Sequence, residues 1–92
     1  MSGNPPGNLE FIAERQRFYP ASWRDAAIRA TYVEPNGVLC TRCNSFFKGR
    51  RALSLLQADH IKAWKRGGLT TWENLQLLCR ACNIAKNDNE AI

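Results

Sequence analysis

The stretch Leu53-Ser54-Leu55-Leu56-Gln57-Ala58-Asp59-His60-Ile61 places the single histidine of this 92-residue chain at the end of an apolar run. Such a run is typical of a strand buried in a small core, so we expect a strand over residues 53–61. Neighbouring side chains on a strand point to opposite faces. The pair Asp59-His60 is therefore the first candidate for a catalytic site, with a carboxylate and an imidazole on either side of one strand end.

Two cysteine pairs bracket this stretch, Cys40-Thr41-Arg42-Cys43 before it and Cys79-Arg80-Ala81-Cys82 after it. Each Cys-x-x-Cys turn offers two thiolates, and two such turns suit tetrahedral zinc, which would also stabilise a domain of this size. The alternative is a pair of disulfides in a secreted protein. We see no signal peptide, so we expect a reducing, cytoplasmic compartment and favour a structural zinc on these four cysteines.

The residues between and after the cysteine pairs add further motifs. Gly67-Gly68 is followed by Asn74-Leu75-Gln76-Leu77-Leu78-Cys79, and then by Asn83 and Lys86. In this order, the pattern resembles the HNH endonuclease family, the ββα-metal nucleases, in an H-N-N variant with a four-cysteine zinc frame. The resemblance covers roughly half of the chain and rests on several independent motifs.

The resemblance implies an α+β fold, with a small ββα-metal core, a four-cysteine structural zinc and N-terminal helices. It implies that His60 is the general base and that Asp59 and Asn83 hold the catalytic cation. Asn74 would steady the loop and the histidine. Asn83 stands where the family pattern has its last histidine, and an amide oxygen favours Mg²⁺ or Mn²⁺ over Zn²⁺ or Ni²⁺. Asn87, one turn further, could face the same site.

The positive charge gathers in the same part of the chain. Residues 1–37 carry four basic and four acidic side chains, whereas residues 38–86 carry nine basic against two acidic ones, within a net charge of +5. The alternative is that these basic residues form an ordinary solvated surface without a binding role. Beside the nuclease motifs, we interpret the excess as a DNA-binding surface. Its candidate contacts are Arg50, Arg51, Lys62, Lys65, Arg66 and Lys86.

We expect one structural domain with three parts: a flexible leader over residues 1–8, a helical extension over residues 9–37 and the nuclease core over residues 38–92. The extension should hold a helix from Leu9 to Phe18 and a second one capped by Ser22, whose Trp23, Ala26, Ala27 and Ala30 form an apolar stripe. A second strand over residues 75–78 and a final helix over residues 80–89 should complete the core. Trp64 and Trp72 should anchor the connecting loop, or alternatively stack on bases.

These expectations amount to a metal-dependent DNA endonuclease that nicks or cuts with weak specificity and leaves 5′-phosphate and 3′-hydroxyl ends. Two alternatives stay open: a nuclease toxin domain neutralised by an immunity protein, and a zinc module that binds DNA without cutting it. A phage packaging protein is a possible partner, and no membrane association is expected.

Overall fold

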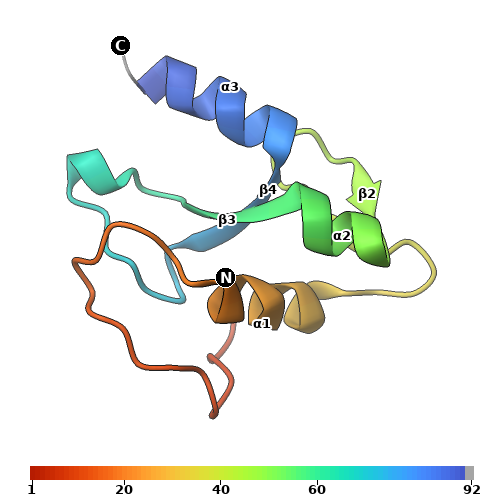
Figure 1. Ribbon diagram of the computed structural model, residues 1–92, viewed down its shortest axis with the longest axis horizontal. Coiled ribbons are helices and arrows are strands. Elements are labelled where there is room, and N and C mark those ends of the chain that lie inside the picture. The colour runs from red at the N-terminus through yellow and green to blue at the C-terminus, as the bar shows by residue number, and fades with distance from the viewer. Residues whose placement is uncertain (91–92) are drawn as a thin grey trace.

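The computed structural model describes residues 1–90, and the side chains up to residue 86. This part of the chain is a small mixed α/β domain with two antiparallel two-stranded sheets and three α-helices (Figure 1). The elements are α1 (Ala21–Thr31), β1 (Val38–Leu39), β2 (Phe46–Phe47), α2 (Arg50–Leu55), β3 (Leu56–His60), the 3₁₀ turn η1 (Trp64–Arg66), β4 (Leu75–Cys79) and α3 (Arg80–Glu90). None of the helices described is both long and apolar enough to cross a membrane.

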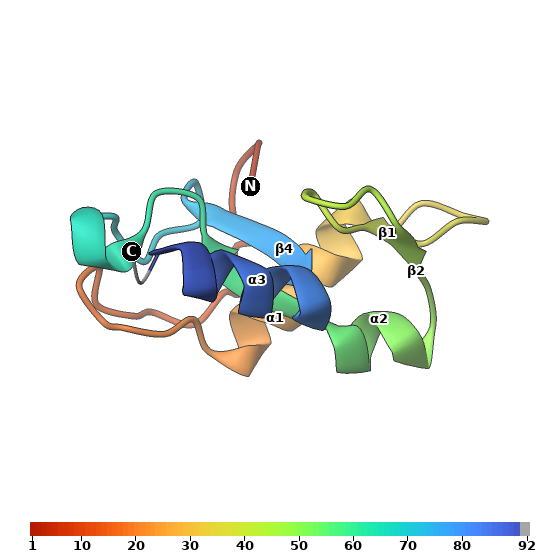
Figure 2. The same cartoon turned by 90° about the horizontal axis from the view of Figure 1, so that it is seen from above.

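The hairpin of β3 and β4 is the centre of the domain. Its register pairs Leu56 with Cys79 and His60 with Leu75. Helix α3 lies over one face of the hairpin and α1 under the other, as the two views in Figures 1 and 2 show. Strand alternation divides the side chains accordingly, because Gln57 and Asp59 contact α3 whereas Leu56 belongs to the core on the α1 side.

Strand β3 is shorter than the sequence predicts. Residues 50–55 form α2, so the expected strand over residues 53–61 is wrong at residues 53–55. Gly49 enters α2 with a φ of 58°, a conformation suited to glycine. Helix α2 buries Ala52 and leaves Leu53 half exposed. The apolar run therefore contains a helical turn followed by a strand, which its composition alone does not separate.

Helix α1 forms close to its expected position, with a different cap. Pro20 precedes the helix, and its carbonyl accepts bonds from the amides of Trp23 and Arg24. Ser22 instead donates its hydroxyl to the Glu10 carboxylate, so the expectation that it caps the helix is wrong. The buried stripe contains Trp23, Ala26, Ala27 and Ile28, while Ala30 is exposed.

The expected helix from Leu9 to Phe18 is wrong. This segment runs as an extended loop along the domain, because its carbonyl groups serve distant partners. Trp23 Nε1 donates to Glu10, the amide of Thr70 donates to Glu14 at 2.7 Å, and Trp64 Nε1 donates to Arg15. Tertiary contacts thus replace the bonds that a helix would have made within the segment.

Candidate functional site

The four cysteines form a cluster between the β1–β2 turn and the start of α3. All four thiols are free, and their sulfur atoms lie within 4.8 Å of one another. The Cys43 and Cys79 sulfurs are 3.9 Å apart, the spacing that two ligands about 2.3 Å from a tetrahedral zinc would have. The donor set and its geometry therefore fit a structural metal such as zinc, and no disulfide joins these residues.

The surroundings of the cluster favour the thiolate form of Cys43 and disfavour that of Cys82. Bonds with Ser45 lower the pKa of Cys43 to about 6, whereas desolvation and the neighbouring sulfurs raise the pKa of Cys82 to about 12. The amide of Cys79 also donates to the Cys40 sulfur at 3.3 Å. A further hydrogen bond joins the two Cys-x-x-Cys turns, because Arg42 donates to the carbonyl of Cys82 at 3.0 Å. A metal here would fix the start of α3 against the β1–β2 turn.

Asp59, His60 and Asn83 line one small cavity of about 110 Å³. Strand β3 supplies the first two side chains and the first turn of α3 supplies the third. The remaining wall comes from Ala58 and from the N-terminal segment, through Arg17, Phe18 and Tyr19. The structure thus brings together three of the four residues that the sequence nominated for catalysis.

The carboxylate of Asp59 faces α3 and has two polar neighbours. Lys86 Nζ lies 2.5 Å from Asp59 Oδ2, and Gln76 Nε2 donates to the same oxygen at 3.2 Å. Gln76 stands opposite Asp59 in the hairpin register, so strand pairing places this amide beside the carboxylate.

Asn83 presents an oxygen atom that its surroundings do not use. Its Nδ2 donates to Gln57 Oε1 at 2.5 Å, which fixes the orientation of the amide. Its Oδ1 is buried, and within the described residues it has no hydrogen-bond partner. A buried acceptor without a donor is costly unless a cation or water satisfies it. A carboxylate and an amide oxygen at one cavity are the hard ligands that Mg²⁺ or Mn²⁺ prefers, so the residues present fit a catalytic cation.

His60 is held on the other side of the strand and is only 6% exposed. Its Nε2 lies 2.8 Å from the hydroxyl oxygen of Thr70. The ring packs on Tyr19, with the ring centres 4.7 Å apart at an angle of 38°. Both partners are absent from the sequence expectations, because Thr70 lies in the connecting loop and Tyr19 precedes α1.

Asn74 closes the loop that follows His60. Its Oδ1 accepts from the amide of Lys62 at 2.8 Å, and its Nδ2 donates to the carbonyls of Lys62 and Leu69. Its own carbonyl accepts from the amide of Ile61 at 2.8 Å. These four bonds hold both ends of the loop together immediately after the histidine, so Asn74 acts on the main chain that carries His60.

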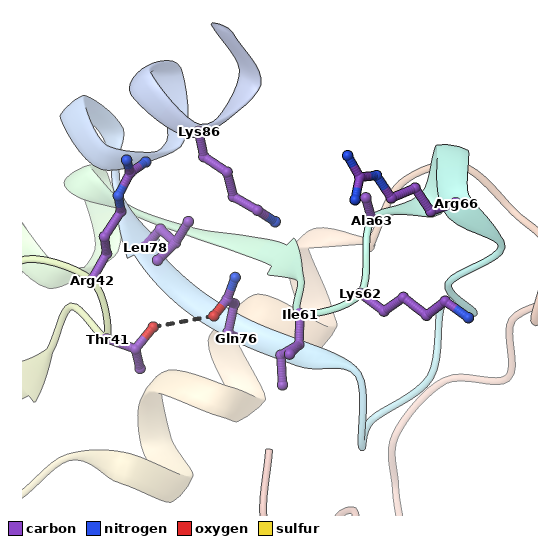
Figure 3. A pocket seen from close by; sticks show the side chains of 9 residues that line it. All are labelled: Thr41, Arg42, Ile61, Lys62, Ala63, Arg66, Gln76, Leu78 and Lys86. Carbon is purple, nitrogen blue, oxygen red and sulfur yellow. Dashed lines mark hydrogen bonds between the residues drawn. The ribbon is translucent and has the colours of Figure 1, made fainter. Parts of the chain in front are cut away.

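A groove of about 630 Å³ runs beside Asp59 on the α3 face, and four basic side chains line it: Arg42, Lys62, Arg66 and Lys86 (Figure 3). Lys86 reaches from α3 and Arg66 from η1 toward the space between the two elements. Three of these residues were expected at a DNA-binding surface. Arg42 was not, although its position inside the first Cys-x-x-Cys turn was a usable signal. Arg50 and Arg51 begin α2, and they and Lys65 are not among the residues that line the groove.

Trp72 and Trp64 differ in their packing. Trp72 is 3% exposed and lies edge-on to Trp23, with the ring centres 6.4 Å apart, so it is a core residue. Trp64 is partly exposed, and Arg17 lies over its ring at 4.8 Å. The side chain of Asn87 lies outside the described residues.

A zinc-type cysteine frame, an antiparallel hairpin and a following helix define a small ββα domain with a candidate cation site. The family model for the HNH endonuclease matches residues 40–89, which is more than half of the chain. This protein belongs to the HNH endonuclease family, a family of nucleases. No curated protein and no solved structure matches the chain.

Proposed function

We propose that this protein is a metal-dependent DNA endonuclease that uses Asp59, His60 and Asn83 as its reacting centre. The observation that carries the proposal is their convergence on one cavity, where Asn83 offers a buried oxygen without a partner in the described part of the chain. A zinc module that only bound DNA would have no need for that oxygen beside a carboxylate and a histidine. Membership of a nuclease family supports the same function.

In the proposed reaction, His60 accepts a proton from a water molecule that attacks the phosphorus atom. A histidine is suited to this role because its ordinary pKa of about 6.5 lies near working pH. Asp59 and Asn83 would hold the divalent cation, Mg²⁺ or Mn²⁺. When bound, that ion supplies positive charge that stabilises the phosphoryl oxygens and the leaving 3′ oxygen. The products would carry 5′-phosphate and 3′-hydroxyl ends.

The basic groove supports DNA as the substrate. Its four cationic side chains lie on the α3 side of the hairpin, where Asp59 also points. Lys86 contacts Asp59 and also lines the groove, so it can stay near a phosphate held at the cation site. Contacts of this kind to the backbone bind DNA with little sequence preference, which agrees with nicking or weakly specific cutting.

The four cysteines would bind zinc as a closed structural site. Four thiolates leave no open position for substrate, so no catalysis is assigned to this metal. Its role would be to fix α3, and therefore Asn83, which directly follows Cys82 in the chain.

The test is cleavage of supercoiled plasmid by the zinc-loaded protein with EDTA, Mg²⁺, Mn²⁺, Ni²⁺ or Zn²⁺. Nicked or linear product with Mg²⁺ or Mn²⁺, and none with EDTA, is expected. His60→Ala should lower the rate by about a hundredfold to ten-thousandfold, the range of a general base. Asn83→Ala should abolish the response to Mg²⁺, while Asn36→Ala, at an exposed turn, serves as a control. Wild type and His60→Ala that shift DNA equally on a gel and cut nothing would instead indicate a binding module.

A further inference from the structure

The hydroxyl of Thr70 connects His60 to the N-terminal segment. Thr70 is 1% exposed, and its oxygen lies 2.8 Å from His60 Nε2. The same hydroxyl donates to the backbone carbonyl of Gln16. Three groups thus form a hydrogen-bonded chain that is buried at the histidine: the imidazole, the hydroxyl and the carbonyl.

The hydrogen atoms of this chain can be assigned from valence alone. A carbonyl oxygen can only accept, and a threonine hydroxyl has a single hydrogen to donate. Because Thr70 gives that hydrogen to Gln16, its oxygen can only accept from His60. Nε2 of His60 must therefore carry a hydrogen, and in the neutral imidazole the lone pair lies on Nδ1.

We propose that Thr70 is a positioning residue that fixes the tautomer of His60, so that Nδ1 is the atom that receives the proton. This inference rests on the proposed function, since a proton acceptor is useful only if His60 is the base. It adds a residue and a main-chain group that lie outside the motif pattern: the Thr70 hydroxyl and the Gln16 carbonyl.

The surroundings of the ring hold it in that orientation. Tyr19 packs against the imidazole, and its hydroxyl donates to the carbonyl of Thr71 at 2.7 Å. The amide of Thr70 donates to the carbonyl of Glu14 at 2.7 Å. Residues 14–19 are therefore bonded to residues 70–71 at three points: the Thr70 amide, the Thr70 hydroxyl and the Tyr19 hydroxyl. The family match covers residues 40–89, so this segment lies outside the matched residues.

The chain contains a single histidine, so the inference can be read directly by nitrogen NMR. In ¹⁵N-labelled zinc-loaded protein, about two pH units above the ordinary histidine pKa of about 6.5, Nε2 should show the shift of a protonated nitrogen and Nδ1 that of an unprotonated one. Thr70→Val, which cannot accept the bond, should shift both nitrogens toward the average of the two tautomers. It should also lower the cleavage rate by about tenfold to a hundredfold.

Two further variants separate the hydroxyl from the packing. Thr70→Ser keeps the hydroxyl and should keep both the tautomer and most of the rate. Thr71→Val changes a neighbouring threonine in the same way and should leave both unchanged. A protonated Nδ1 in the wild type, or an unaltered tautomer and rate in Thr70→Val, would overturn the inference.

The spectrum does not depend on cleavage, so the two proposals can fail separately. A protein that cuts DNA but shows the other tautomer would refute the role of Thr70 alone. A protein with the expected tautomer and no cleavage in any metal would refute the proposed function, and with it the catalytic purpose of the contact.

Discussion

Lys86 Nζ lies 2.5 Å from Asp59 Oδ2 and 2.5 Å from the backbone carbonyl oxygen of His60. The ion pair is mostly buried, since the two side chains are 18% and 15% exposed. The lysine ammonium thus places a positive charge on the carboxylate that we assign to the catalytic cation. Lysine and cation would therefore compete for one carboxylate oxygen.

Replacing Lys86 with methionine should strengthen binding of the divalent cation. Removing a competing ion pair of about 1 kcal/mol corresponds to about fivefold tighter binding. Titration of the zinc-loaded protein with Mn²⁺ by calorimetry measures this directly. Lys65→Met, which removes an exposed lysine from the same domain, should leave the Mn²⁺ affinity unchanged. Equal or weaker Mn²⁺ binding by Lys86→Met would show that the lysine does not compete.

Lys62 and Lys65 form a matched pair for testing the groove. Both are exposed lysines within the loop that follows His60, but only Lys62 lines the groove. Lys62→Ala should weaken DNA binding. It should also reduce the steepness of log affinity against log salt by about 0.9, the value for one phosphate contact. Lys65→Ala should change neither. Both lysine variants are made in the His60→Ala background, so that fluorescence anisotropy over a salt series measures DNA binding without cleavage. The same slope for both variants would exclude the groove as a DNA-binding surface.

Removing the metal from the cysteine cluster should unfold the domain. Structural zinc binds with about 10–16 kcal/mol, which equals or exceeds the whole stability of about 5–15 kcal/mol that folded domains have. Titration with an organomercurial should release one zinc per chain together with a red shift of tryptophan emission, because Trp23 and Trp72 are buried. Zinc release without any change in emission would show that the fold does not depend on the metal.

Tyr19 should ionise only at unusually high pH. Burial of the ring raises its pKa above the ordinary 10.0, and the charges of Asp59 and Glu73 add to this, although the bond to Thr71 acts in the opposite direction. Because the folded pKa is the higher one, the stability that this difference contributes is complete below about pH 10. It is lost as the pH rises through the folded value.

The variant Tyr32→Phe leaves Tyr19 as the only tyrosine, so its phenolate absorbance can be followed alone. The midpoint of the absorbance change should lie above pH 10.0 in the folded protein and at about pH 10 in denaturant. A midpoint near 10 in both states would mean that the ring is solvated, and that Tyr19 does not pack on His60 as described.

Residue type and spacing predicted the cysteine cluster, and the same reasoning nominated Asp59, His60 and Asn83, which line one cavity in the structure. Thr70, Gln57 and Gln76 were not predicted, since ordinary polar residues acquire roles only through tertiary contacts. The same reason explains the wrong helix over residues 9–18, whose carbonyl groups bond to Trp23, Trp64 and Thr70. The helix propensity of residues 9–18 depends only on nearby residues and does not reflect hydrogen bonds to distant donors.

Asn74 closes the loop after His60 with four hydrogen bonds at the base of that loop. The register of β3 and β4 is fixed below this base, and the start of α3 follows directly from β4. Strand β4 and the start of α3 therefore fix the position of Asn83 relative to Asn74. The exposed side chains of Lys65 and Arg66 in this loop can change while the reacting atoms keep their places, which makes these two positions suitable for engineering new DNA contacts.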